Sequence, residues 1–314
     1  MSHKILIPET VAGEGLDFLR QKGYEVKMGR GRDKHVLIED LRDCDAVIIR
    51  VAVIDEEVFS GCPGLKVVAK HGVGVDSIDT QAARRHGCRV VYAPLANTLS
   101  VAEQTIALIF ACAKKLPLKM REYARGNYTI KDTALSTEVS GKTLGLIGAG
   151  RIAREVAHIA RNGLGMRVLA CDPFLPDGFA SDVLELASRE TVLRQADFLS
   201  IHIPATDDTT KSFGEKEFAL MKPAACFINT ARGKIVDEDA LVRALRDGVI
   251  GGAGLDVSDP EPAPPESPLF SLDNVVMSPH CAGVTREAMV RMVMDAAMGI
   301  DEVFSGREPT YPVV

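Results

Sequence analysis

A strand that runs through a glycine-rich turn directly into a helix constrains the fold of this chain more than any other feature of its sequence. Residues 142–147 (KTLGLI) form a short apolar run, residues 148–153 (GAGRIA) follow, and a helical pattern continues to Ala160. The first glycine of such a GxGxxA sequence permits a tight turn, the second lets the backbone approach a diphosphate, and the alanine lets the helix pack on the strand. N–H groups at the start of the helix then face the anion. The pattern therefore predicts a dinucleotide-binding unit.

Short runs of β-branched residues alternate with amphipathic stretches along almost the whole chain, which is typical of parallel sheets covered by helices. The first series of expected strands is Lys4–Ile7, Glu25–Met28, Ala46–Ile49, Leu65–Ala69 and Arg89–Tyr92. The second series is Thr143–Ile147, Arg167–Cys171, Phe198–Ile203, Cys226–Asn229, Gly252–Leu255 and Val275–Ser278. Six strands with this spacing are what a complete dinucleotide-binding domain contains. We therefore expect an α/β protein with two Rossmann-like, doubly wound parallel-sheet domains and a cleft between them.

Asp172 indicates which dinucleotide the turn binds. It ends the strand that follows the helix, about 20 residues beyond the turn, where an acidic residue accepts hydrogen bonds from the adenosine ribose. Its carboxylate would repel a ribose 2′-phosphate, and no arginine follows it in the sequence DPF. The sequence therefore favours NAD over NADP. The contacts expected from the turn itself are Gly148, Gly150, Arg151 and Ile152.

Composition and charge narrow the class of protein. The 314 residues are 46% hydrophobic and carry a formal net charge of −6, which fits an ordinary globular chain and disfavours a nucleic-acid or membrane partner. No apolar run approaches the ~20 residues of a membrane helix, and the first residues lack the pattern of a signal peptide. The seven cysteines include no CxxC pair and no Cys/His spacing suited to zinc, which predicts reduced thiols and no metal. We expect a cytoplasmic protein.

Three segments near the ends of later strands carry the groups that hydride transfer between a nicotinamide and a 2-keto acid requires. They read NTARG, DPEP and SPHC, and loops at strand carboxyl ends are where α/β sheets bind ligands. Arg232 can clamp a carboxylate, His280 can exchange a proton near neutral pH, and Glu261 favours the protonated imidazole. Singly, these residues are equally well explained as a helix cap, a structural histidine and a solvated loop residue. Their combination with the cofactor motif points to catalysis.

On these motifs the chain resembles the D-2-hydroxyacid dehydrogenase family over nearly all of its length. Residues 70–79 (KHGVGVDSID) and 255–257 (LDV) also carry the resemblance. The subgroup it is most similar to is phosphoglycerate dehydrogenase, in a short form without the C-terminal regulatory domain. The resemblance implies reversible hydride transfer between NAD(H) and a small 2-hydroxy or 2-keto acid.

The resemblance also implies a domain plan and an assembly. The substrate (catalytic) domain would comprise residues 1–99 plus 286–314, and the NAD-binding domain residues 100–285. A capping box at Ser100–Glu103 is expected to open a long helix, around which a homodimer would be built. From the segment alone, an ordinary core helix is an equally good interpretation.

Individual roles follow from the same resemblance. Arg232 would orient the substrate, His280 would be the acid/base, and Glu261 would support it. The substrate carboxylate would be bound by the backbone of His71, Gly72, Val73 and Gly74. Further cofactor contacts would be His202, Pro204, Thr209, Thr230, Ala231, Arg232, Asp256 and His280. For His202, a buried histidine at the end of a strand is an almost equally good interpretation.

Two cations of the first domain are candidates for substrate recognition. Arg50 follows the strand Ala46–Ile49, and together with Lys70 and Arg232 it could recognise a phosphorylated or sulfonated keto acid. The subgroup commonly has arginine where Lys70 stands, which weakens the assignment of 3-phosphoglycerate and leaves hydroxypyruvate, glyoxylate, D-lactate-type acids and sulfolactate as alternatives. Lys70 is otherwise a generic charge at the edge of the site, and Arg50 otherwise pairs with an acid such as Asp55.

A binding protein is the main alternative to an enzyme. Transcriptional corepressors that resemble this family keep the fold and the cofactor but act as NAD(H)-responsive scaffolds with little turnover, and an intact triad does not exclude that function. The lack of extra tails or interaction segments favours the enzyme. A metal-dependent hydrolase is disfavoured because the sequence has no HExxH motif and no carboxylate cluster with metal-ligand spacing.

Overall fold

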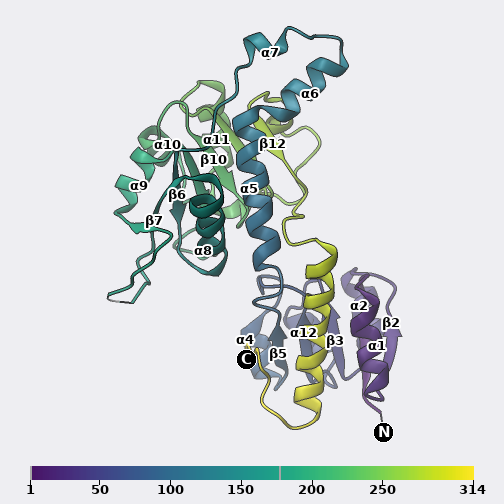
Figure 1. Ribbon diagram of the computed structural model, residues 1–314. Coiled ribbons are helices and arrows are strands. Elements are labelled where there is room, and N and C mark those ends of the chain that lie inside the picture. Colours follow the sequence, from purple (N-terminus) through teal and green to yellow (C-terminus); the bar gives the residue numbers. More distant parts are fainter. Residues whose placement is uncertain (1, 177) are drawn as a thin grey trace. The chain divides into compact units, whose positions relative to one another are not determined.

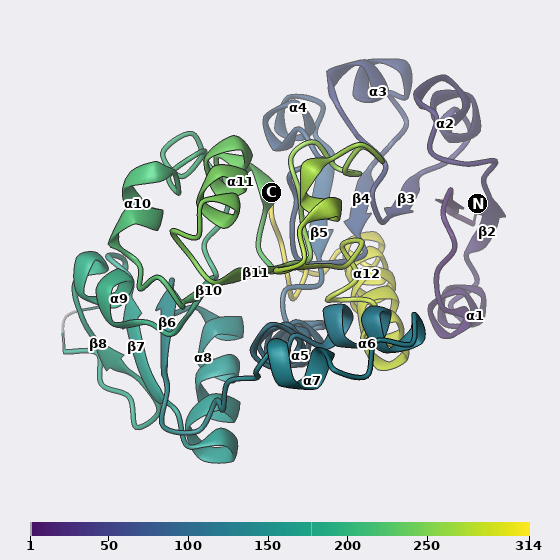
Figure 2. The same ribbon diagram turned by 90° about the horizontal axis from the view of Figure 1, so that it is seen from above.

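The computed structural model describes residues 2–176 and 178–314, and the chain divides into two compact units. Unit 1 comprises Met1–Thr98 with Gly283–Val314, and unit 2 comprises Leu99–Ala282. Each unit contains a parallel sheet with helices on both faces (Figures 1 and 2). The expected fold class, an α/β protein with two Rossmann-like parallel sheets, is confirmed.

Unit 1 is built on a five-stranded sheet in the order β2-β1-β3-β4-β5. Its strands are β1 (Lys4–Ile7), β2 (Glu25–Met28), β3 (Ala46–Ile49), β4 (Val67–Lys70) and β5 (Arg89–Tyr92). One face is covered by α2 (Lys34–Leu41), α3 (Glu56–Gly61) and α4 (Thr80–Arg85), and the other by α1 (Gly13–Gln21) and α12 (Arg286–Phe304) (Figure 2). All four residues of β3 are buried, as expected of a strand with helices on both sides.

Unit 2 is built on a seven-stranded sheet in the order β12-β11-β10-β9-β6-β7-β8. Its strands are β6 (Thr143–Ile147), β7 (Arg167–Cys171), β8 (Glu185–Leu186), β9 (Phe198–Ile201), β10 (Cys226–Asn229), β11 (Gly252–Leu255) and β12 (Val275–Met277). One face packs against α5 (Thr98–Lys114) and α8 (Arg151–His158), and the other against α9 (Arg189–Gln195), α10 (Glu215–Leu220) and α11 (Glu238–Arg246). The remaining elements are α6 (Leu116–Ala124), α7 (Ile130–Thr133), a π-helical turn (Ile159–Gly163) and two 3-10 turns (Gly233–Ile235 and Pro268–Ser271).

The structure corrects several element boundaries that the sequence predicted. The second sheet has seven strands rather than six, because the two-residue strand β8 pairs with β7 and is too short to show a periodicity. The predicted strand Phe198–Ile203 ends at Ile201, where its partner β6 gives way to the glycine-rich turn. The predicted capping box at Ser100 is wrong, because α5 begins at Thr98, and Ser100 lies buried within its first turn.

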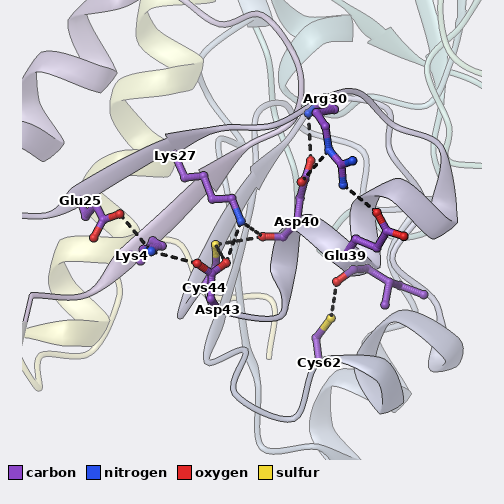
Figure 3. Close-up of polar contacts among 10 residues, drawn as sticks. Lys4, Glu25, Lys27, Arg30, Glu39, Asp40, Asp43, Cys44 and Cys62 are labelled. Carbon is purple, nitrogen blue, oxygen red and sulfur yellow. Dashed lines mark hydrogen bonds and ion pairs between the residues drawn. The ribbon is translucent and has the colours of Figure 1, made fainter.

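A network of charged side chains joins β1, β2 and α2 in unit 1 (Figure 3). Asp43 accepts hydrogen bonds from Lys27 Nζ at 2.7 Å and from Lys4 Nζ at 2.9 Å. Lys27 Nζ also donates to the carbonyl oxygen of Asp40 at 2.7 Å, and the Asp40 carboxylate accepts from Arg30 Nε at 3.0 Å. Lys27, and then Lys4, hold the pKa of Asp43 well below its usual range. The network thus fastens two strands to the connection that follows α2.

We expect Asp43→Asn to lower the free energy of unfolding by about 0.5–1 kcal/mol at low salt, because half-exposed ion pairs contribute little individually and this carboxylate has two partners. The loss should shrink at high salt, which screens exposed charges. Urea unfolding at both salt concentrations measures it. Asp17→Asn, which removes one exposed pair with Arg20, is the control and should cost less. A loss independent of salt would contradict an electrostatic role.

Candidate active site

The glycine-rich turn between β6 and α8 leaves space for an anion at the start of the helix. Gly148 has a φ of +94°, and a Cβ there would lie 2.6 Å from the carbonyl oxygen of His202, so only glycine fits. Gly150 precedes the first residue of α8, and no described atom lies within 4 Å of where its Cβ would be. Ala153 is fully buried against the sheet. The open position at Gly150 and the N–H groups of the first helical turn fit the diphosphate of NAD.

The side chain of Asp172 is hydrogen-bonded to the glycine-rich turn. Its Oδ2 accepts a hydrogen bond from the N–H of Ala149 at 2.8 Å, and its Oδ1 accepts one from the N–H of Phe174 at 2.9 Å. An ionised carboxylate offers about four acceptor positions, so each oxygen retains capacity for a ribose hydroxyl. The structure therefore places the residue expected to hold the adenosine ribose directly beside the residues expected to hold the diphosphate.

His202 and Thr209 have partners within their own segment of the chain. His202 Nε2 lies 2.9 Å from Ser200 Oγ, and burial lowers the pKa of the ring to about 4, so the imidazole is neutral at physiological pH. Thr209 Oγ1 donates to the carbonyl oxygen of Pro204 at 2.7 Å and accepts from the N–H of Thr206 at 2.7 Å. Both side chains thus stabilise the chain after β9, and their contact with the cofactor stays a prediction.

The three predicted catalytic side chains stand on loops that follow three neighbouring strands. Arg232 follows β10, Glu261 follows β11, and His280 follows β12. Because these strands are parallel and adjacent, their carboxyl ends lie at one edge of the sheet. His280 Nδ1 contacts Glu261 Oε1 directly. The structure therefore brings the predicted acid/base and its supporting carboxylate together and places Arg232 on the loop after the adjacent strand.

The backbone of His280 adopts an unusual conformation. Its φ is +50°, a left-handed value that costs energy for a residue with a side chain. Its N–H donates to the carbonyl oxygen of Asp256 at 2.8 Å, which helps to hold the residue there. Since Nδ1 is engaged by Glu261, Nε2 is the nitrogen that remains for exchanging a proton with a substrate.

The buried carboxylate of Asp256 fixes the segment that carries His280. Its Oδ1 accepts hydrogen bonds from Ser278 Oγ at 2.6 Å and from the N–H of Cys281 at 3.0 Å, and its Oδ2 accepts from the N–H of Ala282 at 2.8 Å. The residue is 1% exposed. Its carboxylate therefore positions the segment of His280, whereas its contact with the cofactor stays a prediction.

Asn229 and Thr105, two residues without a predicted role, support the loop that carries Arg232. Asn229 Nδ2 donates to the carbonyl oxygen of Arg232 at 3.0 Å, while its Oδ1 accepts from the N–H of Ala231 at 3.0 Å. From α5, Thr105 Oγ1 lies 3.0 Å from Thr230 Oγ1. Arg232 Nη1 donates to the carbonyl oxygen of Ala231 at 2.8 Å, which orients the guanidinium. Asn229 lies inside the NTARG motif and was therefore detectable, but nothing in the sequence marked Thr105.

Gln104, also on α5, reaches the loop after β12. Its Nε2 donates to Ser278 Oγ at 3.1 Å, and that hydroxyl in turn donates to Asp256. The first turns of α5 therefore contact the loops of both Arg232 and His280, through Thr105 and Gln104.

The predicted cations of unit 1 are held by that unit's own backbone. Lys70 is 8% exposed, and its Nζ donates to the carbonyl oxygen of Arg50 and, at 3.2 Å, to Ser77 Oγ. Arg50 Nη1 donates to the carbonyl oxygen of Thr10 at 3.1 Å. Asp55 pairs with Lys34 at 2.6 Å, so the alternative pairing of Asp55 with Arg50 is not what the structure shows.

The segment from His71 to Gly74 continues from the end of β4. The N–H of His71 donates to the carbonyl oxygen of Ile49 at 2.8 Å, and that of Gly72 to the carbonyl oxygen of Lys70 at 3.0 Å. Within the described part of unit 1, the N–H groups of Val73 and Gly74 have no such acceptor. The His71 ring is buried, which lowers its pKa to about 4, and its Nε2 lies 3.2 Å from the carbonyl oxygen of Met289.

Nowhere in residues 2–176 and 178–314 do three or more His, Cys, Asp or Glu side chains gather in a way that would hold a metal ion. Over the same residues, no helix has both the length and the apolar character needed to span a membrane.

Comparison with known proteins gives consistent matches. The family model described as D-isomer specific 2-hydroxyacid dehydrogenase, NAD binding domain, matches residues 106–282. The D-3-phosphoglycerate dehydrogenase of Archaeoglobus fulgidus is 39% identical over 305 residues, which are 96% of this chain. This chain spans only 58% of that relative's length. The glyoxylate reductase of Korarchaeum cryptofilum is 36% identical over 300 residues, which cover 93% of this chain and 90% of the relative.

Solved structures share the whole fold. A protein from Thermus thermophilus superposes with a TM-score of 0.92 at 38% identity, covering 99% of this chain and 100% of the other. The D-lactate dehydrogenase of Lactobacillus jensenii, solved with NAD+, has a TM-score of 0.84 at 28% identity, with 99% of each chain covered.

The loops that follow β10 and β11 come close together at Gly233. A Cβ on Gly233 would lie 2.0 Å from the carbonyl oxygen of Ser258, so the loops after β10 and β11 touch there. We expect Gly233→Ala to lower the free energy of unfolding by about 1–3 kcal/mol, the usual cost of overpacking. Gly163→Ala, whose Cβ would meet no described atom within 4 Å, is the matched control. Urea unfolding compares the two variants, and equal stability would mean that the loops do not pack as described.

Proposed function

The chain belongs to the D-isomer specific 2-hydroxyacid dehydrogenase family, and from this premise we propose that it interconverts a small 2-hydroxy acid and the corresponding 2-keto acid with NAD(H). The observation that carries the proposal is the contact of His280 with Glu261, on loops of the same sheet that holds the glycine-rich turn. An enzyme needs this acid/base pair, whereas a scaffold that only senses NAD(H) does not. The comparisons give no support to the scaffold alternative.

His280 is the proton donor and acceptor of the proposed reaction. A bound nicotinamide would supply or accept the hydride. In the direction of reduction, protonated His280 donates its Nε2 proton to the carbonyl oxygen, and in oxidation the neutral ring removes the hydroxyl proton. Glu261, in contact with Nδ1, orients the imidazole ring so that Nε2 is directed away from Glu261.

Arg232 holds the substrate carboxylate and polarises the adjacent carbonyl group. A guanidinium can bind a carboxylate through two parallel N–H bonds, which fixes the orientation of the acid as well as its position. The bonds of Asn229 to the backbone of Ala231 and Arg232 keep this loop rigid. Precise orientation is a large part of the rate enhancement in such reactions.

In the proposed enzyme, unit 1 supplies the substrate contacts and unit 2 binds the cofactor. Arg50 and the N–H groups of Val73 and Gly74 are the contacts we propose for the carboxylate end or a second polar group of the acid, with Lys70 supporting them. The position of Asp172 supports NAD over NADP. All seven cysteines have free thiols, which supports the proposal of a reducing, cytoplasmic location.

We also propose that the protein is a homodimer whose interface includes α6 and α7. Figure 1 shows where α6 and α7 lie in the chain. In and around these two helices, five large apolar side chains are 44–70% exposed, namely Leu116, Met120, Tyr123, Tyr128 and Leu135. Soluble monomers seldom expose so many large apolar groups on one segment. A second copy of the chain is the proposed partner because an isologous interface would bury this segment on both subunits.

His280→Ala tests the catalytic proposal. We expect kcat to fall by about 10²–10⁴-fold, the usual contribution of a general acid or base, while the affinity for NADH, measured by fluorescence, stays within about twofold because binding does not require the proton transfer. Turnover is measured with NADH and NADPH against glyoxylate, hydroxypyruvate, pyruvate and 3-phosphohydroxypyruvate. His158→Ala, on the exposed surface of α8, is the control. Tight NADH binding by the wild-type protein without turnover on any acid would favour a scaffold.

Tyr123→Asp tests the dimer. A charge in an apolar interface should dissociate it, which light scattering after size-exclusion chromatography detects as a halved mass. Met28→Asp, at an apolar position in unit 1 that is 55% exposed compared with 65% for Tyr123, should leave the mass unchanged. A monomeric wild-type protein, or a variant that keeps the mass of the dimer, would contradict the proposal.

A further inference from the structure

One carboxylate in unit 1 accepts hydrogen bonds from three successive backbone N–H groups. Glu9 follows β1, and its Oε2 accepts from the N–H of Arg50 at 2.8 Å, of Val51 at 3.0 Å and of Ala52 at 3.1 Å. Its Oε1 also lies 3.2 Å from the N–H of Val51. Because β1 and β3 are neighbouring parallel strands, the residues that follow them meet at one edge of the sheet. Successive N–H groups of this kind form anion-binding concavities, and here the anion belongs to the chain itself.

The carbonyl oxygen and the guanidinium group of Arg50 also form hydrogen bonds. Its carbonyl oxygen accepts a hydrogen bond from Lys70 Nζ, and its Nη1 donates to the carbonyl oxygen of Thr10. The Lys70 side chain is in turn anchored to Ser77 Oγ. Both backbone polar groups of Arg50 and its guanidinium therefore have partners within unit 1.

Apolar packing explains only part of the shape of this loop, because Ala52 and Ile54 are buried in the core of unit 1 whereas Val51 and Val53 are exposed. Val51 and Val53 are 54% and 52% exposed, so their side chains do not anchor it in the core. The loop's conformation therefore depends on polar contacts as well, and four of the five hydrogen bonds to its backbone described above end on Glu9. This loop exposes apolar side chains next to a cation, and a carboxylate of another segment fixes its backbone. Such an arrangement is typical of a loop that binds a ligand rather than of one that only connects two elements.

We propose that Glu9 is a positioning residue of the substrate site: its carboxylate holds the Arg50–Ala52 segment so that Arg50, Val51 and Val53 meet the substrate in a fixed orientation. Lys70 acts in the same way through the carbonyl group of Arg50. This inference rests on the proposed dehydrogenase function and adds to it two residues that act through Arg50 without touching the reacting atoms.

The chemistry of Glu9 makes conservative variants informative. Glutamine has the same shape, and its amide oxygen can take the place of Oε2, but it lacks the charge and would put a donor NH₂ group in the place of Oε1, which faces the N–H of Val51. Aspartate keeps the charge and both oxygens but is shorter by one methylene. Alanine leaves the N–H groups unpaired and opens a space that a small carboxylate from solution can enter.

The experiment compares Glu9→Gln, Glu9→Asp and Glu9→Ala with Glu14→Gln, a control at an exposed glutamate on α1. For the 2-keto acid that the wild-type protein uses best, we expect Glu9→Gln to raise KM roughly tenfold or more, as expected for losing charge-assisted hydrogen bonds, and to change kcat by less than about threefold. Glu9→Asp should recover part of the loss, and added formate should lower the KM of Glu9→Ala. The affinity for NADH should be unchanged in all variants, because the proposed cofactor residues belong to unit 2.

Hydrogen exchange gives a readout that does not depend on turnover. The amide protons of residues 50–52 should exchange faster in Glu9→Gln than in the wild type, while those of the β3 core remain protected. An unchanged KM, or a KM that rises only together with weaker NADH binding and lower stability, would overturn the positioning role. If the wild-type protein turns over no 2-keto acid, the proposed function fails and this inference with it. Normal wild-type turnover with an unaffected Glu9→Gln variant would overturn this inference alone.

Discussion

The geometry of the proposed active site in unit 2 depends on the buried carboxylate of Asp256. A charge that is 1% exposed is tolerated only when hydrogen bonds replace the water it has lost. The segment from Ser278 to Ala282 supplies these bonds, and the carboxylate in return fixes the backbone around His280. The left-handed conformation of His280 persists because these contacts offset its cost. The same hydrogen bonds thus offset two unfavourable energies, the burial of the Asp256 charge and the backbone strain at His280.

Glu9 repeats this arrangement in unit 1. There too, a carboxylate that follows one strand accepts hydrogen bonds from the backbone of a loop after a neighbouring strand. In both units the side chain that we propose to act on the substrate, Arg50 or His280, belongs to the loop that accepts this support, and the carboxylate that gives it belongs to another residue. Parallel sheets favour this division of roles because neighbouring loops leave the same edge, so a side chain from one can reach the backbone of the next.

The hydrogen bonds by which one residue fixes the backbone of a distant loop could not be predicted from the sequence. The glycine-rich turn, Asp172 and the segments of Arg232, Glu261 and His280 were recognisable because their chemistry is local, within a few residues of a strand end. Glu9, Gln104 and Thr105 act on loops 41 to 174 positions away, and no local pattern marks such a partner. The two-residue strand β8 was missed for a similar reason, since its pairing with β7 is the only feature that makes it a strand.

Lys70 shows why charge alone does not define the substrate. Its sequence position suggested a cation for a phosphorylated acid, but its ammonium group is buried and bonded to the carbonyl oxygen of Arg50 and to Ser77. An ammonium group in such a position acts on an anion mainly by orienting its neighbour. In the proposed enzyme, discrimination between a small acid and one with a second anionic group would therefore depend on Arg50 and on the exposed Val51 and Val53 beside it. Exposed apolar neighbours beside a cation would favour a compact acid at this proposed site, because a doubly charged group would lose hydration against them.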